Sequence, residues 1–106
     1  MKKAGIDFGT YNSAVCIKDS LGNIHFITPQ KSASCFARVI PTFIEFDAEG
    51  KVVSYGQRAK NNLSFYPSRV IWGIKRLLGK TWQFAKEEGE LERFTYKVIG
   101  KDEGKI

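Results

Sequence analysis

The 106-residue sequence has only two cysteines, Cys16 and Cys35, too few for a disulfide framework or a zinc site. It also lacks any run of about 18 apolar residues, so we expect no membrane span. The basic N-terminus, residues 1–3, is followed by too short an apolar stretch for a secretory signal peptide, because Asp7 interrupts it. Both cysteines fit a reducing compartment, and together these absences predict a cytoplasmic protein.

Acidic residues are absent from the middle of the chain. Residues 51–80 carry seven basic and no acidic side chains, whereas the charges nearly balance in residues 1–50 and 81–106. A positive patch of this kind can face phosphates, nucleic acid or an acidic partner, or it can be the solvated face of a helix. The length allows at most one ordinary domain, and 42% hydrophobic residues are enough for a small core.

Residues 5–13, Gly-Ile-Asp-Phe-Gly-Thr-Tyr-Asn-Ser, are the most informative stretch for function. A strand-like lead places Asp7 beside a tight glycine turn, and a second apolar strand follows at once. Glycine allows the backbone to approach a ligand closely, and successive N–H groups in such a turn can form an anion-binding nest. An aspartate at the point where phosphates arrive requires an intervening cation such as magnesium.

The same residues also fit a plain β-hairpin, in which Asp7 caps its own backbone. No Gly-Lys-Ser/Thr sequence follows, so the loop is not a Walker loop. A strand rather than a helix follows the glycine, which excludes the dinucleotide-binding fingerprint. The residues alone therefore leave both the hairpin and the phosphate loop open.

Apolar and turn patterns predict an N-terminal group of strands at residues 4–6, 13–19 and 24–27, with a turn at 20–23. Consecutive apolar residues at 14–17 predict that the second strand is covered on both faces, with Cys16 a buried thiol. A polar loop is expected at residues 28–38, where Cys35 can be exposed.

A second group of elements is predicted after this loop. Pro41 restricts Ile40 to an extended conformation. The elements expected next are strands at 43–46 and 51–55, a turn at 47–50, and a helix at 57–65 that Pro67 ends.

The clearest helical pattern runs from Ser68, a possible N-cap, to Gly79, which lies where a C-terminal glycine is expected. Five apolar residues fall on one arc at 100° per residue: Val70, Ile71, Ile74, Leu77 and Leu78. Gly73 inside this helix costs roughly 1 kcal/mol against alanine. Lys75 lies on the edge of the arc with its ammonium free to reach out, and Arg76 points nearer the opposite face.

Beyond Lys80 the pattern weakens. It indicates a helical turn at residues 87–91, a strand at 96–99 and a turn at 100–104.

Four pieces of the sequence resemble the seventy-kilodalton heat-shock chaperones (DnaK-type), in order and in spacing. They are Gly-Ile-Asp-Phe-Gly-Thr at 5–10, Pro-Thr-Phe-Ile at 41–44, Gly-x-x-Ala-Lys-Asn at 56–61 and Ile-Lys-Arg-Leu-Leu-Gly at 74–79. Residues 94–98 also resemble a strand that follows in that family. The resemblance spans nearly the whole chain and implies the N-terminal part of the family's nucleotide-binding domain.

The resemblance implies the α/β fold of the actin-like, ribonuclease-H-like ATPases, in which two lobes flank a nucleotide cleft. Residues 1–38 would be the opening strands and loop of the first lobe, and residues 39–106 an incomplete peripheral subdomain. We expect this chain alone to bind ATP very weakly and to hydrolyse it negligibly, because only one wall of the cleft is present. Uncovered strand edges and apolar faces predict self-association.

The family's first glycine loop clasps the β- and γ-phosphates of ATP or ADP through backbone N–H groups, which here are those of Gly9, Thr10, Tyr11 and Asn12. The Thr10 hydroxyl would add a contact near the γ-phosphate. Asp7 would hold Mg²⁺ through its water shell. Lys75 matches the lysine that reaches the γ-phosphate and orients the attacking water, whereas a surface lysine is its ordinary interpretation.

Two residues depart from the family pattern. Tyr11 stands where a second threonine is usual, and its hydroxyl lies farther from the backbone. Because the backbone N–H remains, we expect Tyr11 to affect the hydrolysis rate and the magnesium geometry more than nucleotide binding. Whether the parent protein is an active ATPase stays open. Phe8 replaces a smaller aliphatic residue and requires local repacking. For Arg76, a salt bridge to the other lobe and simple solvation both remain open.

Other functions also remain open. A sugar kinase or a cell-shape filament protein shares the Asp-x-Gly-Thr loop, but we do not associate either with the segment at 74–79. A small basic module would bind nucleic acid or a partner through residues 51–80, where Phe65, Tyr66 and Trp72 interleave with basic residues, although such aromatics are also typical of a core. The chaperone resemblance instead implies unfolded client peptides and co-chaperones as partners of the parent protein, and neither nucleic acid nor a membrane.

Overall fold

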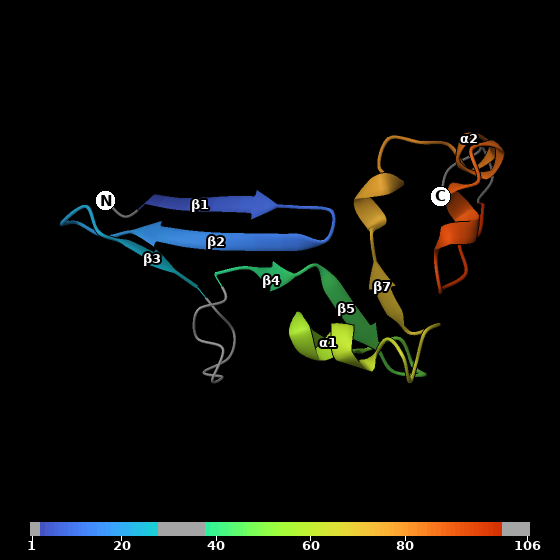
Figure 1. Cartoon of the computed structure of the whole chain (residues 1–106), viewed down its shortest axis with the longest axis horizontal. Helices are drawn as coiled ribbons and strands as arrows, with labels where there is room; N and C mark the ends of the chain where they lie inside the picture. Colours follow the sequence, from blue (N-terminus) through green and yellow to red (C-terminus); the bar gives the residue numbers. More distant parts are fainter. Residues whose placement is uncertain (1–2, 28–37, 101–106) are drawn as a thin grey trace.

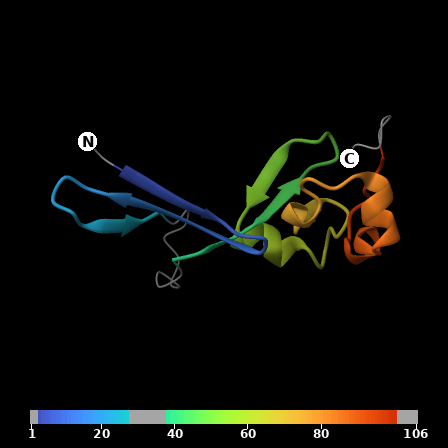
Figure 2. The same ribbon diagram turned by 90° about the horizontal axis from the view of Figure 1, so that it is seen from above.

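The computed structural model describes residues 3–27 and 38–100, which form two small antiparallel sheets side by side along an elongated chain (Figures 1 and 2). The first sheet lies at the left in Figure 1, and the second lies at the right with the short helices. Residues 28–37, which hold most of the predicted polar loop together with Cys35, lie outside the described residues. The mixed α/β composition is the one that the sequence predicts.

The first sheet is a meander of β1 (Lys3–Phe8), β2 (Asn12–Lys18) and β3 (Ile24–Phe26). The three predicted strands are therefore confirmed, with ends shifted by one or two residues. Gly22 has a φ of 86° in the turn before β3, a backbone conformation that favours glycine. The Asp19 carboxylate accepts the N–H groups of Leu21 and Asn23, each at 2.9 Å, and fixes this turn.

The prediction that β2 is covered on both faces is wrong for the described residues. All six residues of β1 are exposed, and Cys16 in β2 is half-buried rather than buried. Within residues 3–27 and 38–100, the helices lie beside the second sheet (Figure 2), and the helix at residues 57–62 contacts the first sheet at residues 40–41. Apolar side chains such as Ile6, which is 74% exposed, therefore face open space.

The second part of the chain begins at β4 (Ile40–Pro41), which pairs with β2 and joins the two sheets. The second sheet then has the order β6-β5-β7. Its strands and first helix are β5 (Phe43–Phe46), β6 (Val52–Tyr55), α1 (Gln57–Asn62) and β7 (Val70–Trp72). The predicted strands at 43–46 and 51–55 are confirmed, whereas the helix predicted at 57–65 ends at residue 62.

A buried carboxylate explains how α1 is fixed to the second sheet. Glu45 of β5 is only 6% exposed. It accepts hydrogen bonds from the Ser54 hydroxyl at 2.7 Å and from the Asn62 amide at 2.9 Å. These bonds, that of Asn62 first, hold the pKa of Glu45 below its usual range. The side chain of Asn62 is thereby committed to the sheet at the residue where the helix ends.

The helix predicted at residues 68–79 is wrong. Residues 70–72 form β7, in which Ile71 pairs with Ile44 of β5. Gly73 then has a φ of 64°, and a single 3₁₀ turn, η1 (Ile74–Arg76), follows. The apolar arc misled because β-branched residues at the start of the segment fit a strand equally well. Gly73 is thus a break between two elements, and no helix begins at Ser68.

The C-terminal part is more helical than predicted. Helix α2 (Trp82–Glu87) starts at Thr81, whose hydroxyl accepts the N–H of Phe84 at 3.2 Å. After Gly89, with a φ of 73°, the chain forms the 3₁₀ helix η2 (Glu90–Arg93). The single helical turn predicted at 87–91 is therefore interrupted at Gly89.

The strand predicted at 96–99 is absent from the described residues, because Tyr96 packs into the core instead of pairing with a neighbouring strand. Residues 101–104 of the predicted final turn lie outside the described residues.

Trp72 joins the two apolar clusters of the second part. One cluster contains Phe43, Ala59 and Val70, and the other contains Leu77, Ala85, Phe94 and Tyr96. The Trp72 ring lies 6.4 Å from the ring of Phe43 and 5.4 Å from that of Phe94, measured between centroids. This aromatic row keeps the 3₁₀ turn and α2 attached to the second sheet. Among the described residues, no helix is long and apolar enough to cross a membrane.

Replacing Gly73 by alanine separates the observed kink from a continuous helix. In the structure, the new Cβ would lie 3.2 Å from Phe94 Cε1 on a backbone with positive φ. We expect the free energy of unfolding in urea to fall by about 1–2 kcal/mol. Gly79→Ala is the control: Gly79 also has a positive φ, but nothing lies within 4 Å of the new Cβ, so the unfolding free energy should fall by less. In a continuous helix, Gly73→Ala would instead stabilise the protein by about 1 kcal/mol.

The phenol of Tyr96 makes the free energy of unfolding depend on pH in the alkaline range. Burial raises the pKa of Tyr96 from 10.0 to about 12, so the folded state holds the proton more tightly than the unfolded chain. This contribution is present below pH 10 and is lost as the pH rises towards 12. Across this window we expect wild type to lose about 2–3 kcal/mol more unfolding free energy than Tyr96→Phe. Tyr55→Phe, at an exposed position, is the control, and equal losses in all three proteins would contradict the assignment.

Candidate functional site

The turn between β1 and β2, residues 9–11, is called the glycine turn below. Thr42, in the second part of the chain, forms hydrogen bonds that hold it. Its N–H donates to the carbonyl of Tyr11 at 2.8 Å. Its hydroxyl donates to the carbonyl of Gly9 at 3.0 Å and accepts a hydrogen bond from the Ser13 hydroxyl at 2.7 Å. Two carbonyl groups of the turn therefore accept hydrogen bonds from Thr42, and these bonds fix the conformation of the turn.

The N–H groups of the same turn are left without partners. Within residues 3–27 and 38–100, the backbone N–H groups of Gly9, Thr10 and Tyr11 have no protein acceptor. In this part of the chain, the side chains of Thr10 and Asn12 also form no hydrogen bond with protein. Successive unpaired N–H groups in a fixed turn are a suitable arrangement for binding an anion.

The turn has no room for a side chain at position 9. A Cβ built on Gly9 would lie 2.1 Å from the carbonyl oxygen of Asn12, closer than any real contact. Glycine is required here by the close approach of two backbone segments rather than by a positive φ.

Asp7 lies near the end of β1, opposite Ala14 and exposed. Among the described residues its carboxylate has no hydrogen-bond or ion-pair partner, and no group of three or more potential metal ligands is found there. Mg²⁺ commonly keeps several waters and takes only one or two carboxylates together with substrate phosphates. A lone, exposed carboxylate beside a turn with unpaired N–H groups fits that mode and does not fit an all-protein metal cage.

The 3₁₀ turn brings Lys75 to Phe8, the residue before the glycine turn, although the two are 67 residues apart. The Lys75 ammonium donates to the backbone carbonyl of Phe8 and lies 5.3 Å from the centroid of the Phe8 ring. Figure 1 shows η1, between β7 and α2, beside the end of the β1–β2 hairpin. Lys75 is half-buried, and its ammonium is bound at the hairpin in a contact that remains exposed to solvent.

Arg76 links the glycine turn to η2. Its Nη1 donates to the Tyr11 hydroxyl at 2.7 Å, and its Nε donates to Glu90 Oε2 at 3.1 Å. The hydrogen bond from Arg76 holds the pKa of Glu90 below its usual range, and Glu90 followed by Tyr11 raises the pKa of Arg76. Of the two roles left open for Arg76, simple solvation is wrong, because Glu90 and Tyr11 accept hydrogen bonds from its guanidinium. The salt bridge to the other lobe stays a prediction.

The sequence did not identify Thr42 or Glu90 as site residues. Thr42 belongs to the motif at residues 41–44, but its contacts depend on the pairing of β4 with β2, which local patterns do not predict. Glu90 gives no signal beyond its charge, because its position depends on the left-handed turn at Gly89 and on the packing of η2. Of the predicted site residues, the structure places Lys75 next to the glycine turn, which includes Tyr11.

A comparison with protein-family models bears on this arrangement. The family model described as Hsp70 protein matches residues 3–106. The match covers both sheets, the glycine turn and the Lys75–Arg76 pair.

Gly9→Ala tests whether close packing defines the turn. We expect the new methyl group to push the Asn12 carbonyl away and to lower the free energy of unfolding by about 1–3 kcal/mol. Gly5→Ala in the same hairpin is the control, because its Cβ would meet only the Cys16 sulfur at 3.2 Å, at the end of a side chain that can move. Denaturant unfolding gives the energies, and backbone NMR shifts at residues 9–13 report the turn. Equal effects of the two changes would contradict the packing argument.

Proposed function

Because the chain belongs to the Hsp70 family, we propose that its glycine turn binds the β- and γ-phosphates of ATP and that Lys75 acts in their hydrolysis. Hsp70 proteins are ATP-binding chaperones with an actin-like ATPase fold, and this chain is part of such an ATPase domain. The observation that carries the proposal is the set of unpaired N–H groups at Gly9, Thr10 and Tyr11, with the Lys75 ammonium held beside them.

We assign residues 1–38 to the opening strands and loop of the first lobe and residues 39–106 to an incomplete peripheral subdomain. The change from the first sheet to the second at β4 supports a boundary near this point. Family membership favours the chaperone over the sugar kinases and cell-shape filament proteins that share the Asp-x-Gly-Thr loop.

The proposed roles of the turn residues follow from the hydrogen-bond donors that each residue carries. The N–H groups at positions 9–12 would contact phosphate oxygens, and the Thr10 hydroxyl would add a donor near the γ-phosphate. Asp7 would hold Mg²⁺ through water, and Mg²⁺ bound there would neutralise charge on the phosphates. Fixed donors aimed at phosphate oxygens need no reorganisation during the reaction, which is the main contribution a protein makes to phosphoryl transfer.

Lys75 has a position suited to the γ-phosphate. Its ammonium lies at the carbonyl of Phe8, one residue before the turn, and its neighbours there are uncharged. The ammonium can therefore leave this carbonyl for a phosphate oxygen without breaking an ion pair. From there it would orient the attacking water and stabilise charge that develops in the transition state.

The remaining assignments follow from the family. Hsp70 proteins generally bind client proteins and co-chaperones. We propose unfolded peptides as clients of the parent protein, a cytoplasmic location and a role in the stress response. The 106-residue chain alone should bind MgATP very weakly, because it contributes one wall of a cleft that needs two.

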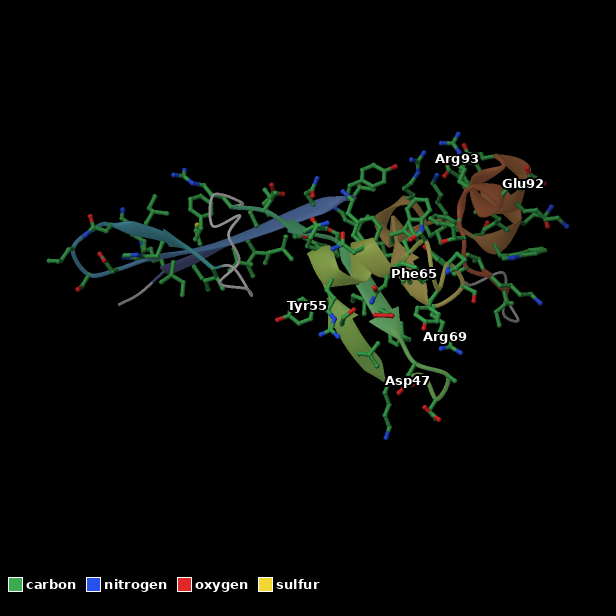
Figure 3. The ribbon with its side chains drawn as sticks, turned by 60° about the horizontal axis from the view of Figure 1, so that its bottom comes forward. Asp47, Tyr55, Phe65, Arg69, Glu92 and Arg93 are labelled. Carbon is green, nitrogen blue, oxygen red and sulfur yellow. The ribbon has the colours of Figure 1, made fainter. Side chains whose placement is uncertain are left out.

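A second candidate function is polyanion binding through residues 51–80. One observation favours it: Phe65 is 74% exposed, and the Arg69 guanidinium lies 5.5 Å from the centroid of the Tyr66 ring. Figure 3 shows Phe65 and Arg69 on the part of the chain that holds the second sheet. Trp72, however, packs in the core and is not free to stack on bases. Oligonucleotide binding that fell steeply with salt would favour this function.

Lys75→Ala tests the proposed ATPase role in the whole polypeptide that the gene encodes. We expect magnesium-dependent ATP turnover to fall by about 10²–10³-fold, because one fixed donor to the reacting phosphate is lost. Lys51→Ala, at an exposed lysine, is the matched control and should leave turnover unchanged. Unchanged turnover in Lys75→Ala would overturn the role of this residue. Tight nucleotide binding without turnover in the wild-type protein would show a nucleotide-binding protein that lacks ATPase activity.

A further inference from the structure

The two residues that depart from the family pattern, Phe8 and Tyr11, are the two that receive Lys75 and Arg76. The Phe8 carbonyl and ring hold the Lys75 ammonium, and the Tyr11 hydroxyl accepts a hydrogen bond from Arg76 at 2.7 Å. Consecutive cations of one short turn are thus bound at the two ends of the same hairpin loop. This coincidence points to a function for the unusual tyrosine.

In the described part of the chain, these two contacts are the only hydrogen bonds between η1 and the hairpin. Among the hydrogen bonds of residues 3–27 and 38–100, only those of Lys75 and Arg76 join residues 3–27 to residues 43–100. The other links run through β4 and Thr42. Lys75 and Arg76 are therefore the side chains that join η1 directly to the loop by hydrogen bonds, in addition to the indirect link through Thr42.

The two side chains are not equally able to fix a position. Lys75 has a flexible stem and a compact ammonium, whereas the planar guanidinium of Arg76 bonds in fixed directions. Arg76 is also held from behind, because its Nε and Nη2 donate to Glu90 at 3.1 and 3.4 Å. The Glu90 side chain is 12% exposed, so this anchor belongs to the packed part of the molecule. Arg76 is thus a rigid bridge between η2 and the loop.

We propose that Tyr11 is a positioning residue, which accepts Arg76 at the loop and thereby holds η1 so that Lys75 faces the phosphate site. This inference rests on the proposed function of Lys75. A threonine at position 11 would have its hydroxyl close to the backbone and would not reach Arg76, so the arrangement is specific to a long side chain with a terminal acceptor. Tyr11 acts through Arg76 and η1, and its hydroxyl is assigned no contact with nucleotide.

The test compares Tyr11→Phe, Arg76→Lys and the double variant in the whole polypeptide that the gene encodes. Tyr11→Phe keeps the ring and removes only the acceptor, and Arg76→Lys keeps the charge and removes the fork. We expect each to lower kcat by about tenfold with little change in KM for ATP, and the double variant to be no worse than either alone. Tyr55→Phe, at the exposed tyrosine labelled in Figure 3, should change neither constant.

A second readout needs no nucleotide. In the 106-residue chain, hydrogen exchange at the amides of Leu77 and Leu78, which donate to Ile74 and Lys75, reports whether η1 is held. We expect Tyr11→Phe and Arg76→Lys to speed this exchange and Tyr55→Phe to leave it unchanged.

The outcomes separate this inference from the proposed function. Wild-type kcat in Tyr11→Phe, together with loss of turnover in Lys75→Ala, would overturn the inference and leave the proposed function standing. Unchanged exchange in Tyr11→Phe would overturn it as well. Additive losses in the double variant would contradict action through Arg76. If wild-type turnover does not depend on Lys75, the proposed function fails, and the positioning role fails with it.

Discussion

The left-handed backbone at Gly73 is the constraint on which the arrangement of the site depends. It ends β7 directly after Trp72, whose ring holds the two apolar clusters together, and starts η1 in a new direction. A continuous helix would carry residues 74–76 onward along the axis of the residues before them. The kink instead presents two consecutive cations to the loop of a hairpin more than sixty residues earlier. Gly73 thus connects the strand that packs in the core to the turn that carries Lys75 and Arg76.

Local patterns predicted the elements whose identity is decided locally. The strands of the first sheet and those of the β5–β6 hairpin follow from apolar runs bounded by turn residues such as Gly22 and Gly50. The segment from Ser68 to Gly79 failed because its apolar spacing fits a helix, while its neighbours make it a strand and a turn. Gly73 was interpreted as a tolerated cost when it was the signal for a break. Pairing of Ile71 with Ile44 decides the matter, and that contact is invisible in a short window.

The candidate site divides in the same way. The glycine turn and Lys75 were found because their motifs are contiguous in the sequence. Thr42, Glu90 and the contact between Tyr11 and Arg76 were missed because each joins segments that only the folded chain brings together. The residues to which we assign chemistry can therefore be named from the sequence, whereas the residues that hold them in place need the folded structure.

The two adjacent cations at the loop differ in how much of their charge is available. Arg76 is compensated by the carboxylate of Glu90. The neighbours of the Lys75 ammonium are the Phe8 carbonyl, which accepts a hydrogen bond from it, and the Phe8 ring, and neither carries a net negative charge. An approaching anion therefore gains its long-range attraction from Lys75 and meets Arg76 as part of the scaffold. If the loop binds phosphates as proposed, Lys75 would supply the attraction while the hydrogen bond between Arg76 and Tyr11 stays in place.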